Sequence, residues 1–182
     1  ARGSVQHAAT LYTLAGMQLD QNPQQALSLI NQLVSPWKEH SASVSLKARA
    51  LQASGQPQQA LAAIQAALPF SPADYLLLHT QATILQQQGD NQGATKILRQ
   101  LTELRPTDPM IWRQLGRAAA SADQTALAYR ANAEHLFLSG QHPQALRQLE
   151  LALQQARSAG DFRQEAALRQ RLQVMANTPS RF

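Results

Sequence analysis

Apolar residues recur along the chain at intervals of three and four, which is the spacing of one face of an α-helix. The segments on either side of Gly55 show this pattern most clearly, and each of them predicts one helix. The helix after Gly55 has an apolar face made of Ala60, Leu61, Ile64 and Leu68. Strong helix formers fill most other positions, and the β-branched residues that favour strands are sparse. The pattern predicts an all-α protein.

Several residue types return at one fixed interval. Gly55 and Gly89 stand 34 residues apart. The same interval of 34 joins Ala26 to Ala60, Ala60 to Ala94, Ala48 to Ala82, Leu51 to Leu85, Ile64 to Leu98 and Pro72 to Pro106. A period of about 34 residues is typical of tetratricopeptide (TPR) repeats, in which two antiparallel helices form each unit. The chain therefore resembles a TPR protein.

Residues that break helices stand where a helix pair needs them. Gly55 has no Cβ atom and suits the tight turn between two helices. Pro57 fits a first helical turn, where its missing N–H costs nothing, and Pro72 ends the second helix. We predict an α-solenoid of about ten antiparallel helices in a single domain, residues 1–182. Its predicted repeats are 5–34, 42–69, 73–104, 109–139 and 125–159, followed by a polar capping helix at 162–176.

The period is interrupted in the second half of the chain. Trp112, Leu115 and Gly116 match the opening of a TPR first helix. Gly89 and Gly140, however, are 51 residues apart, which is one repeat of 34 plus a half repeat of 17. The segment 125–139 would then be the second helix of one repeat and the first helix of the next. Trp112 is expected to pack in the core, and so is Trp37, because large aromatic side chains in small domains are mostly buried.

Composition narrows the function classes. The chain has no Cys, so disulfides and Cys-ligated metal sites are excluded. The net charge of +5 is spread thinly, without a basic run or a nucleic-acid motif, and we expect no nucleic-acid partner. No apolar run approaches the roughly 18–20 residues that span a bilayer. The sequence starts ARGSVQ, without Met, which suggests a processed product or an excised segment of a longer protein.

No pattern of catalytic residues is present. The five histidines, His7, His40, His79, His135 and His142, form no H-E-x-x-H motif. Glu134 and His135 with His142 are the closest cluster, and a surface or turn role suits them better than metal binding. Phosphate-binding and nucleophile-elbow motifs are absent as well. We expect a non-catalytic chain that binds no cofactor and acts by protein binding.

The TPR resemblance implies a concave groove lined by the first helices of successive repeats. The fifth and ninth places of each repeat would face it: Leu11 and Ala15, Ser45 and Arg49, His79 and Thr83, Arg113 and Arg117, Arg130 and Glu134. The arginines would favour carboxylates, such as a peptide C-terminus or an acidic segment. Glutamines nearby could bond a peptide backbone. The predicted partner-binding groove consists of Arg49, Gln52, His79, Gln86, Arg113, Arg117 and Arg130; the alternative is that these are solvated surface residues.

A narrower resemblance covers residues 75–176 well and 5–70 loosely. The spacing from Ala128 to Ala133-Glu134, followed by Gly140 and Ala145, is similar to the C-terminal TPR region of bacterial zinc metalloproteases of the β-barrel assembly-enhancing type (BepA). The resemblance implies a periplasmic, non-catalytic interaction domain in outer-membrane protein assembly and quality control. Zinc would then belong to a separate peptidase domain. The implied partners are the assembly machinery, its substrates and that peptidase domain.

A second hypothesis of a different kind remains open. The chain could come from a free-standing TPR scaffold of a pilus or secretion assembly. The sequence upstream of this segment separates the two hypotheses, because only a zinc protease would carry H-E-x-x-H there.

Overall fold

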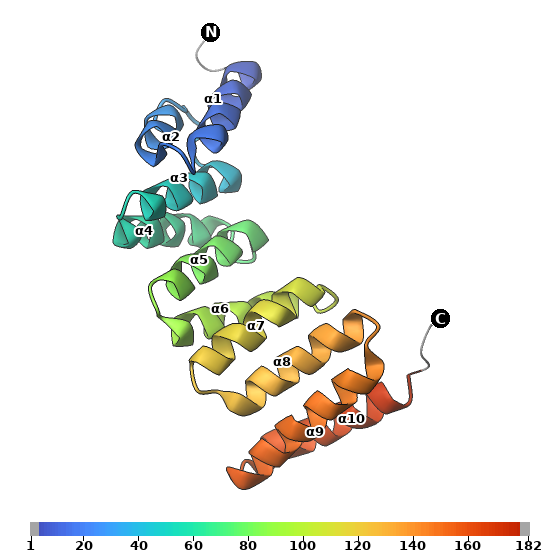
Figure 1. Ribbon diagram of the computed structural model, residues 1–182. Helices are drawn as coiled ribbons and strands as arrows, with labels where there is room; N and C mark the ends of the chain where they lie inside the picture. The colour runs from blue at the N-terminus through green and yellow to red at the C-terminus, as the bar shows by residue number, and fades with distance from the viewer. Residues whose placement is uncertain (1–3, 179–182) are drawn as a thin grey trace. The chain divides into compact units, whose positions relative to one another are not determined.

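The computed structural model describes residues 4–178, and these form ten α-helices and one short 3₁₀ helix without any strand (Figure 1). In the first half the helices are α1 (Val5–Gln18), α2 (Pro23–Ile30), α3 (Ser41–Ala53), α4 (Pro57–Ala67), η1 (Leu68–Phe70) and α5 (Tyr75–Gln87). In the second half they are α6 (Asn91–Leu104), α7 (Pro109–Ser121), α8 (Thr125–Leu138), α9 (His142–Ser158) and α10 (Phe162–Ala176). The predicted all-α, TPR-like arrangement of antiparallel helices is confirmed.

The helices group into two compact units. The first unit is residues 1–89 and contains α1 to α5; the second is residues 90–182 and contains α6 to α10. Each unit has buried clusters of its own. The sequence-based division into one domain of five repeats stays a prediction.

Residues in the left-handed conformation stand in several of the turns between consecutive helices. Gly55, Gly89 and Gly140 have φ angles of 74°, 78° and 79°, a conformation that costs glycine little. Asp123, between α7 and α8, also has a positive φ, of 58°. It stands 34 residues after Gly89 and 17 before Gly140. The regular interval therefore continues to Asp123, and the half-repeat step begins only there.

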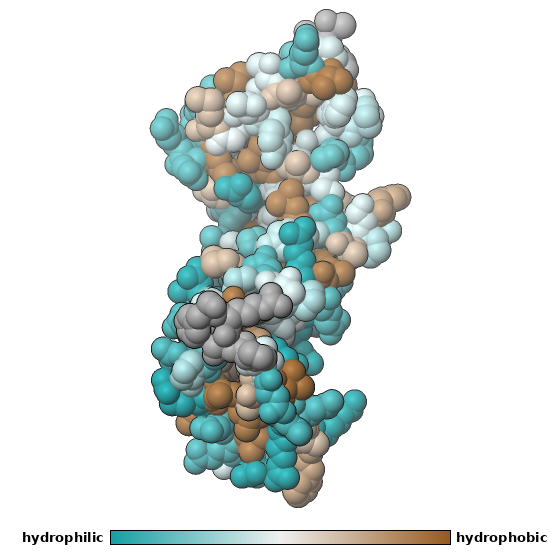
Figure 2. Space-filling model, turned by 90° about the vertical axis from the view of Figure 1, so that its right-hand side faces the viewer, coloured by the Kyte–Doolittle hydropathy of each residue, from teal (hydrophilic) through white to brown (hydrophobic). Residues whose placement is uncertain are grey.

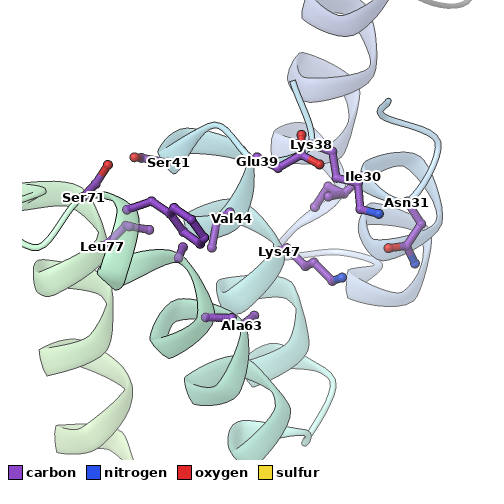
Figure 3. Close-up of a pocket in the computed structure, with 13 residues that line it drawn as sticks. Ile30, Asn31, Lys38, Glu39, Ser41, Val44, Lys47, Ala63, Ser71 and Leu77 are labelled. Atoms are coloured by element: carbon purple, nitrogen blue, oxygen red, sulfur yellow. The ribbon is translucent and has the colours of Figure 1, made fainter. Parts of the chain in front are cut away.

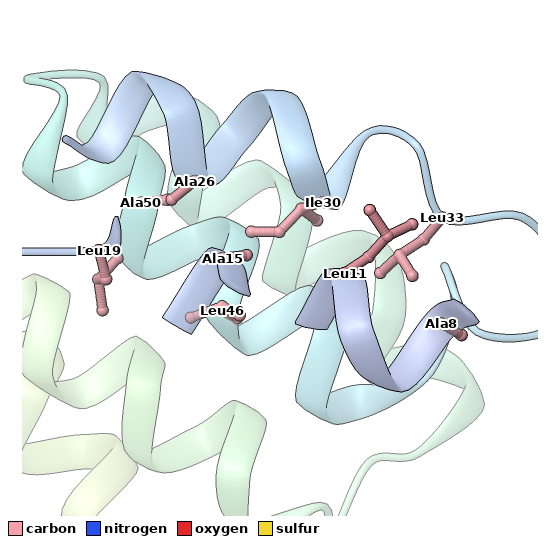
Figure 4. Close-up of a cluster of buried hydrophobic side chains, with 9 residues drawn as sticks. All are labelled: Ala8, Leu11, Ala15, Leu19, Ala26, Ile30, Leu33, Leu46 and Ala50. Carbon is pink, nitrogen blue, oxygen red and sulfur yellow. The ribbon is translucent and has the colours of Figure 1, made fainter. Parts of the chain in front are cut away.

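The core of the first unit contains two clusters. Leu11, Leu33 and Leu46 belong to the first of them, which joins α1, α2 and α3 (Figure 4). Trp37 is half-buried against this cluster, as the sequence predicts. The second cluster places Ile64 against α3 and α5. Alanines at several of these contacts keep the helices close together.

The core of the second unit is built around α8 and α9. Trp112 is buried in α7, and its indole N–H donates a hydrogen bond to the Pro106 carbonyl oxygen over 2.8 Å. Gly116 lies so close to α8 that a Cβ atom at this position would come within 2.4 Å of Asn132 Oδ1. Leu168 and Met175 are the residues that α10 buries, and they pack on the α8–α9 cluster. The exposed side of α10 is mainly polar, with Phe162 and Val174 as its exposed apolar residues.

Candidate functional site

A groove of about 530 Å³ lies in the first unit. The end of α1, the helix α3 and the helix α5 form its walls. Ten residues line it: Leu19, Asp20, Arg49, Gln52, Ala53, His79, Thr80, Thr83, Ile84 and Gln87. Its size is within the range of ordinary ligand sites.

Helical spacing puts the polar lining residues on one face of each helix. His79, Thr83 and Gln87 are separated by steps of four on α5, so their side chains lie one above another. The lining residue Thr80 and the adjacent Ser45 form a buried hydrogen bond of 2.7 Å between their hydroxyls. This bond joins α3 to α5 and fixes the two lining helices relative to each other.

Several polar groups of the groove have unused hydrogen-bonding capacity. Arg49 is exposed and makes no ion pair within residues 4–178. The side-chain oxygen of Gln52 is buried without a hydrogen-bond partner among the described residues. The Thr83 hydroxyl donates to the His79 carbonyl oxygen over 2.9 Å and keeps its acceptor lone pairs. The His79 ring stacks on Tyr75 with a centroid distance of 5.7 Å, which limits its rotation.

The structure brings three of the predicted groove residues together: Arg49, Gln52 and His79. Gln86 is half-buried and does not line the groove, whereas the adjacent Gln87 does. Gln87 was among the glutamines that the sequence offered for bonding a peptide backbone, and it lies a further step of four from Thr83. Asp20 was missed because it belongs to the turn after α1, outside the positions considered.

The remaining predicted residues belong to the second unit. Arg113 and Arg117 are one turn apart on α7. Arg117 is exposed, whereas the Nε atom of Arg113 is buried without a partner in the described part of the chain. Arg130, on α8, lines a separate cavity of about 380 Å³ together with Arg99. This cavity is not lined by the α7 arginines.

Four positions expected to face the groove are buried instead. They are Leu11, Ala15, Ser45 and Glu134, each with no more than 5% of its surface exposed. Leu11 and Ala15 pack in the first core cluster, because α1 turns this apolar face towards α2 and α3. The Ser45 hydroxyl is hydrogen-bonded to the Thr80 hydroxyl, and Glu134 accepts two hydrogen bonds from Arg171. Assigning positions from repeat phase alone was therefore wrong for these residues.

The histidine cluster near α8 has structural contacts. His135 Nδ1 is 2.9 Å from the Pro109 carbonyl oxygen, and the His142 ring stacks on Phe137 at 4.6 Å. Across residues 4–178, no group of three or more His, Asp or Glu side chains is placed to hold a metal ion. The same residues include no helix with the length and apolar character needed to cross a membrane. On the face shown in Figure 2, apolar residues are scattered among polar ones.

Antiparallel helix pairs with left-handed turns at a 34-residue interval define a TPR-like protein–protein interaction scaffold. The chain belongs to the ChAPs family (Chs5p-Arf1p-binding proteins), whose model matches residues 8–135. No curated protein matches the chain in sequence.

Solved structures support the same fold at low sequence identity. MamA (residues 41 to the end) from Desulfovibrio magneticus RS-1 matches with a TM-score of 0.62 and 16% identity, over 93% of this chain and 94% of that one. The TPR-like repeats of a putative kinesin light chain from Podosopora anserina match with a TM-score of 0.60 and 20% identity, over 92% and 94%. PilF from Pseudomonas aeruginosa matches with a TM-score of 0.58 and 16% identity, over 94% and 93%. At these identities the matches establish the fold alone.

Proposed function

We propose that the first unit binds an extended peptide segment of a partner protein in the groove between α1, α3 and α5. The observation that carries the proposal is the shared lining of this groove by Arg49 and Gln52, both with unused polar capacity. A buried amide oxygen without a partner costs about 1–3 kcal/mol, so a ligand N–H that reaches Gln52 removes a penalty. The ChAPs name describes proteins that bind other proteins, which agrees with a protein partner.

The groove favours a carboxylate near Arg49. A guanidinium can donate two parallel hydrogen bonds to one carboxylate, which adds direction as well as energy. Gln52 and Gln87 offer both amide donors and carbonyl acceptors, the two groups that a peptide backbone needs. Asp20 also lines this groove, and its negative charge disfavours a second ligand carboxylate close to it. A free C-terminus, with one carboxylate and an otherwise neutral chain, meets these conditions best.

The test uses two labelled peptides of equal sequence, one with a free C-terminal carboxylate and one amidated. We expect the free acid to bind several-fold more tightly, and Arg49→Gln to abolish that difference. Arg147→Gln is the matched control, because Arg147 is an exposed arginine of α9 that lines none of these cavities. Fluorescence anisotropy supplies the dissociation constants. Equal loss of affinity in both arginine variants would indicate general charge attraction and contradict the proposal that the peptide binds in the groove.

The arginines of the second unit extend the proposal to a second acidic contact. Arg113 and Arg117 are close enough on α7 to meet one acidic segment. Arg130 would act separately, because it lines the cavity that contains Arg99. His79 belongs to the groove of the first unit, whereas Gln86 does not line it.

The sequence resemblance of residues 75–176 supports a narrower proposal about the parent protein. In that proposal the chain is the interaction domain of a periplasmic zinc metalloprotease in outer-membrane protein assembly, and zinc belongs to the peptidase domain. The family and structural matches describe the scaffold and carry no link to a protease. The gene sequence upstream tests it: a parent without H-E-x-x-H excludes the protease and favours a free-standing scaffold.

A further inference from the structure

A second, mainly apolar pocket of about 570 Å³ lies elsewhere in the first unit (Figure 3). It is formed by the end of α2, the segment 31–40, α3, α4, η1 and the start of α5. Its apolar lining consists of Ile30, Val44, Ala63, Ala66, Ala67, Phe70 and Leu77. No residue lines both this pocket and the groove that contains Arg49.

Phe70 is the most exposed large apolar side chain among the described residues. Its ring stands 89% exposed at the pocket, on the short helix η1. An aromatic ring that is exposed to water lacks the hydrophobic stabilisation that burial against a partner would provide. The position therefore contributes little to packing in the folded chain and is available for a ligand.

Lysines are concentrated at this pocket. The chain has only three, Lys38, Lys47 and Lys96, and the first two line the pocket. Neither of these two takes part in an ion pair within residues 4–178. In the view of Figure 3 both ammonium groups point towards the end of the pocket where Asn31 lies.

The one acidic residue of the lining is already engaged. Glu39 Oε1 accepts a hydrogen bond from the Ser35 hydroxyl over 2.8 Å, and this bond stays within the segment 31–40. This bond orients the carboxylate but leaves its charge, so the two lysines exceed the one glutamate of the lining by a single positive charge, and the rest of the wall is largely apolar.

We propose that this pocket binds a segment of a partner protein in which an aliphatic or aromatic side chain is adjacent to carboxylates. The apolar side chain fills the space between Val44, Leu77 and Phe70. The carboxylates lie against Lys38 and Lys47, neither of which forms an ion pair within residues 4–178. Charge complementarity of this kind selects the partner and speeds its association.

The distribution of polar groups favours a peptide over a fatty acid. Asn31 and Ser71 lie at opposite ends of the pocket (Figure 3). A peptide offers backbone donors and acceptors along its whole length and can bond both ends. A fatty acid has polar atoms at one end only and would leave the Ser71 end without a hydrogen-bonding partner.

The experiment is an NMR titration of isotope-labelled protein with three peptides in a Gly-Ser background. One contains a single Phe flanked by two Asp, the second replaces both Asp by Asn, and the third replaces Phe by Ser. We expect the first peptide to shift resonances of the pocket residues and to bind about tenfold more tightly than the second, the size that two partly exposed ion pairs supply. The third should bind at least as weakly as the second.

Variants of the chain locate the effect. Lys38→Gln with Lys47→Gln should remove the roughly tenfold preference for Asp over Asn, whereas Lys96→Gln, which removes the same charge in the second unit, should leave it unchanged. Phe70→Ser should weaken the first peptide several-fold, and Phe162→Ser is its control, since Phe162 is 80% exposed on α10. Arg49→Gln should have no effect.

Three results would overturn the proposal. The first is the absence of pocket shifts with any peptide up to millimolar concentration. The second is equal sensitivity of binding to Lys96→Gln and to the pocket lysines. The third is dodecanoate binding that depends on Lys38 and Lys47 while the peptides fail, which would assign the pocket to an anionic amphiphile.

Discussion

Arg171 on α10 donates two hydrogen bonds to Glu134 on α8, from Nε to Oε1 over 2.7 Å and from Nη2 to Oε2 over 2.6 Å. The Glu134 side chain is only 6% exposed, and the guanidinium also lies 5.5 Å from the centre of the Phe137 ring. Both helices pack on α9, so this forked pair ties the last helix to α8 of the second unit. The pair therefore helps to fix the position of α10, which is a polar helix with few buried residues.

Removal of Arg171 should destabilise the second unit. Arg171→Met leaves a carboxylate buried without a partner, and we expect a loss of about 2 kcal/mol in the free energy of unfolding. Arg171→Met combined with Glu134→Gln should lose less than the two single variants added together. Urea denaturation measures all three. The control is Arg169→Met, which should lose clearly less, because Arg169 is 61% exposed and Glu165 keeps its second partner, Arg157.

Two glycine substitutions should act in opposite directions. Gly16 lies inside α1 with open space around it, so Gly16→Ala should stabilise the chain by about 0.5–1 kcal/mol. Gly89 has a φ of 78°, so Gly89→Ala should destabilise it by about 1 kcal/mol although nothing obstructs the added methyl group. Thermal unfolding followed by circular dichroism checks both. Stabilisation by both substitutions would show that the turn conformation is not required.

The arginine pair of α7 should contribute to partner binding and little to folding. Arg113→Ala with Arg117→Ala is expected to weaken binding of an acidic peptide by about tenfold while helicity stays unchanged. The matched control is Arg147→Ala with Arg163→Ala, a pair of exposed arginines in the same unit. Anisotropy gives the affinities and circular dichroism the helicity. Equal weakening by the control pair would reject a specific role for α7.

Stability should fall in acid partly through Asp74. Burial alone would raise the pKa of this carboxyl, but hydrogen bonds from the Ser41 hydroxyl and from the Leu77 and Leu76 backbone, together with the charge of His40, lower it below its ordinary value of 3.8. Because the folded-state pKa is depressed, the contribution is complete above pH 3.8 and disappears as the pH falls through the folded-state pKa.

The comparison with Asp74→Asn isolates this contribution. Asparagine still caps α5 but cannot titrate, so the variant should show a weaker loss of stability below about pH 4. Urea denaturation between neutral pH and about pH 3 gives the two curves. Parallel curves for the two proteins would exclude Asp74 as a source of the acid sensitivity.

The turn residues show how far the repeat pattern could be followed along the sequence. Gly55 and Gly89 reveal the interval directly, because glycine is the usual residue for a left-handed turn. Asp123 keeps the same interval without a glycine, since a short polar side chain also tolerates this conformation. The alignment on glycines therefore found the half-repeat step, and Asp123 marks the turn directly before the helix at which it occurs.

The candidate groove could be predicted only in part. Arg49 and His79 follow from their helical positions, because a fixed spacing puts them on one face of neighbouring helices. The choice of Gln87 over Gln86, and the presence of Asp20, depend on how far the groove extends along α5 and into the turn after α1. Those limits are set by packing between helices, which no single helix encodes.

Local chemistry within the sequence determined the helices, their turns and the repeat interval, because these depend on residues close together along the chain. The tertiary structure alone decided which polar residues are available. Ser45 occupies a position equivalent to the half-buried His79, and Glu134 one equivalent to the exposed Arg49, yet both are buried, in contact with Thr80 and Arg171, which lie 35 and 37 residues further along the chain. A residue becomes buried or exposed through its neighbours in space, and repeat phase does not specify those neighbours.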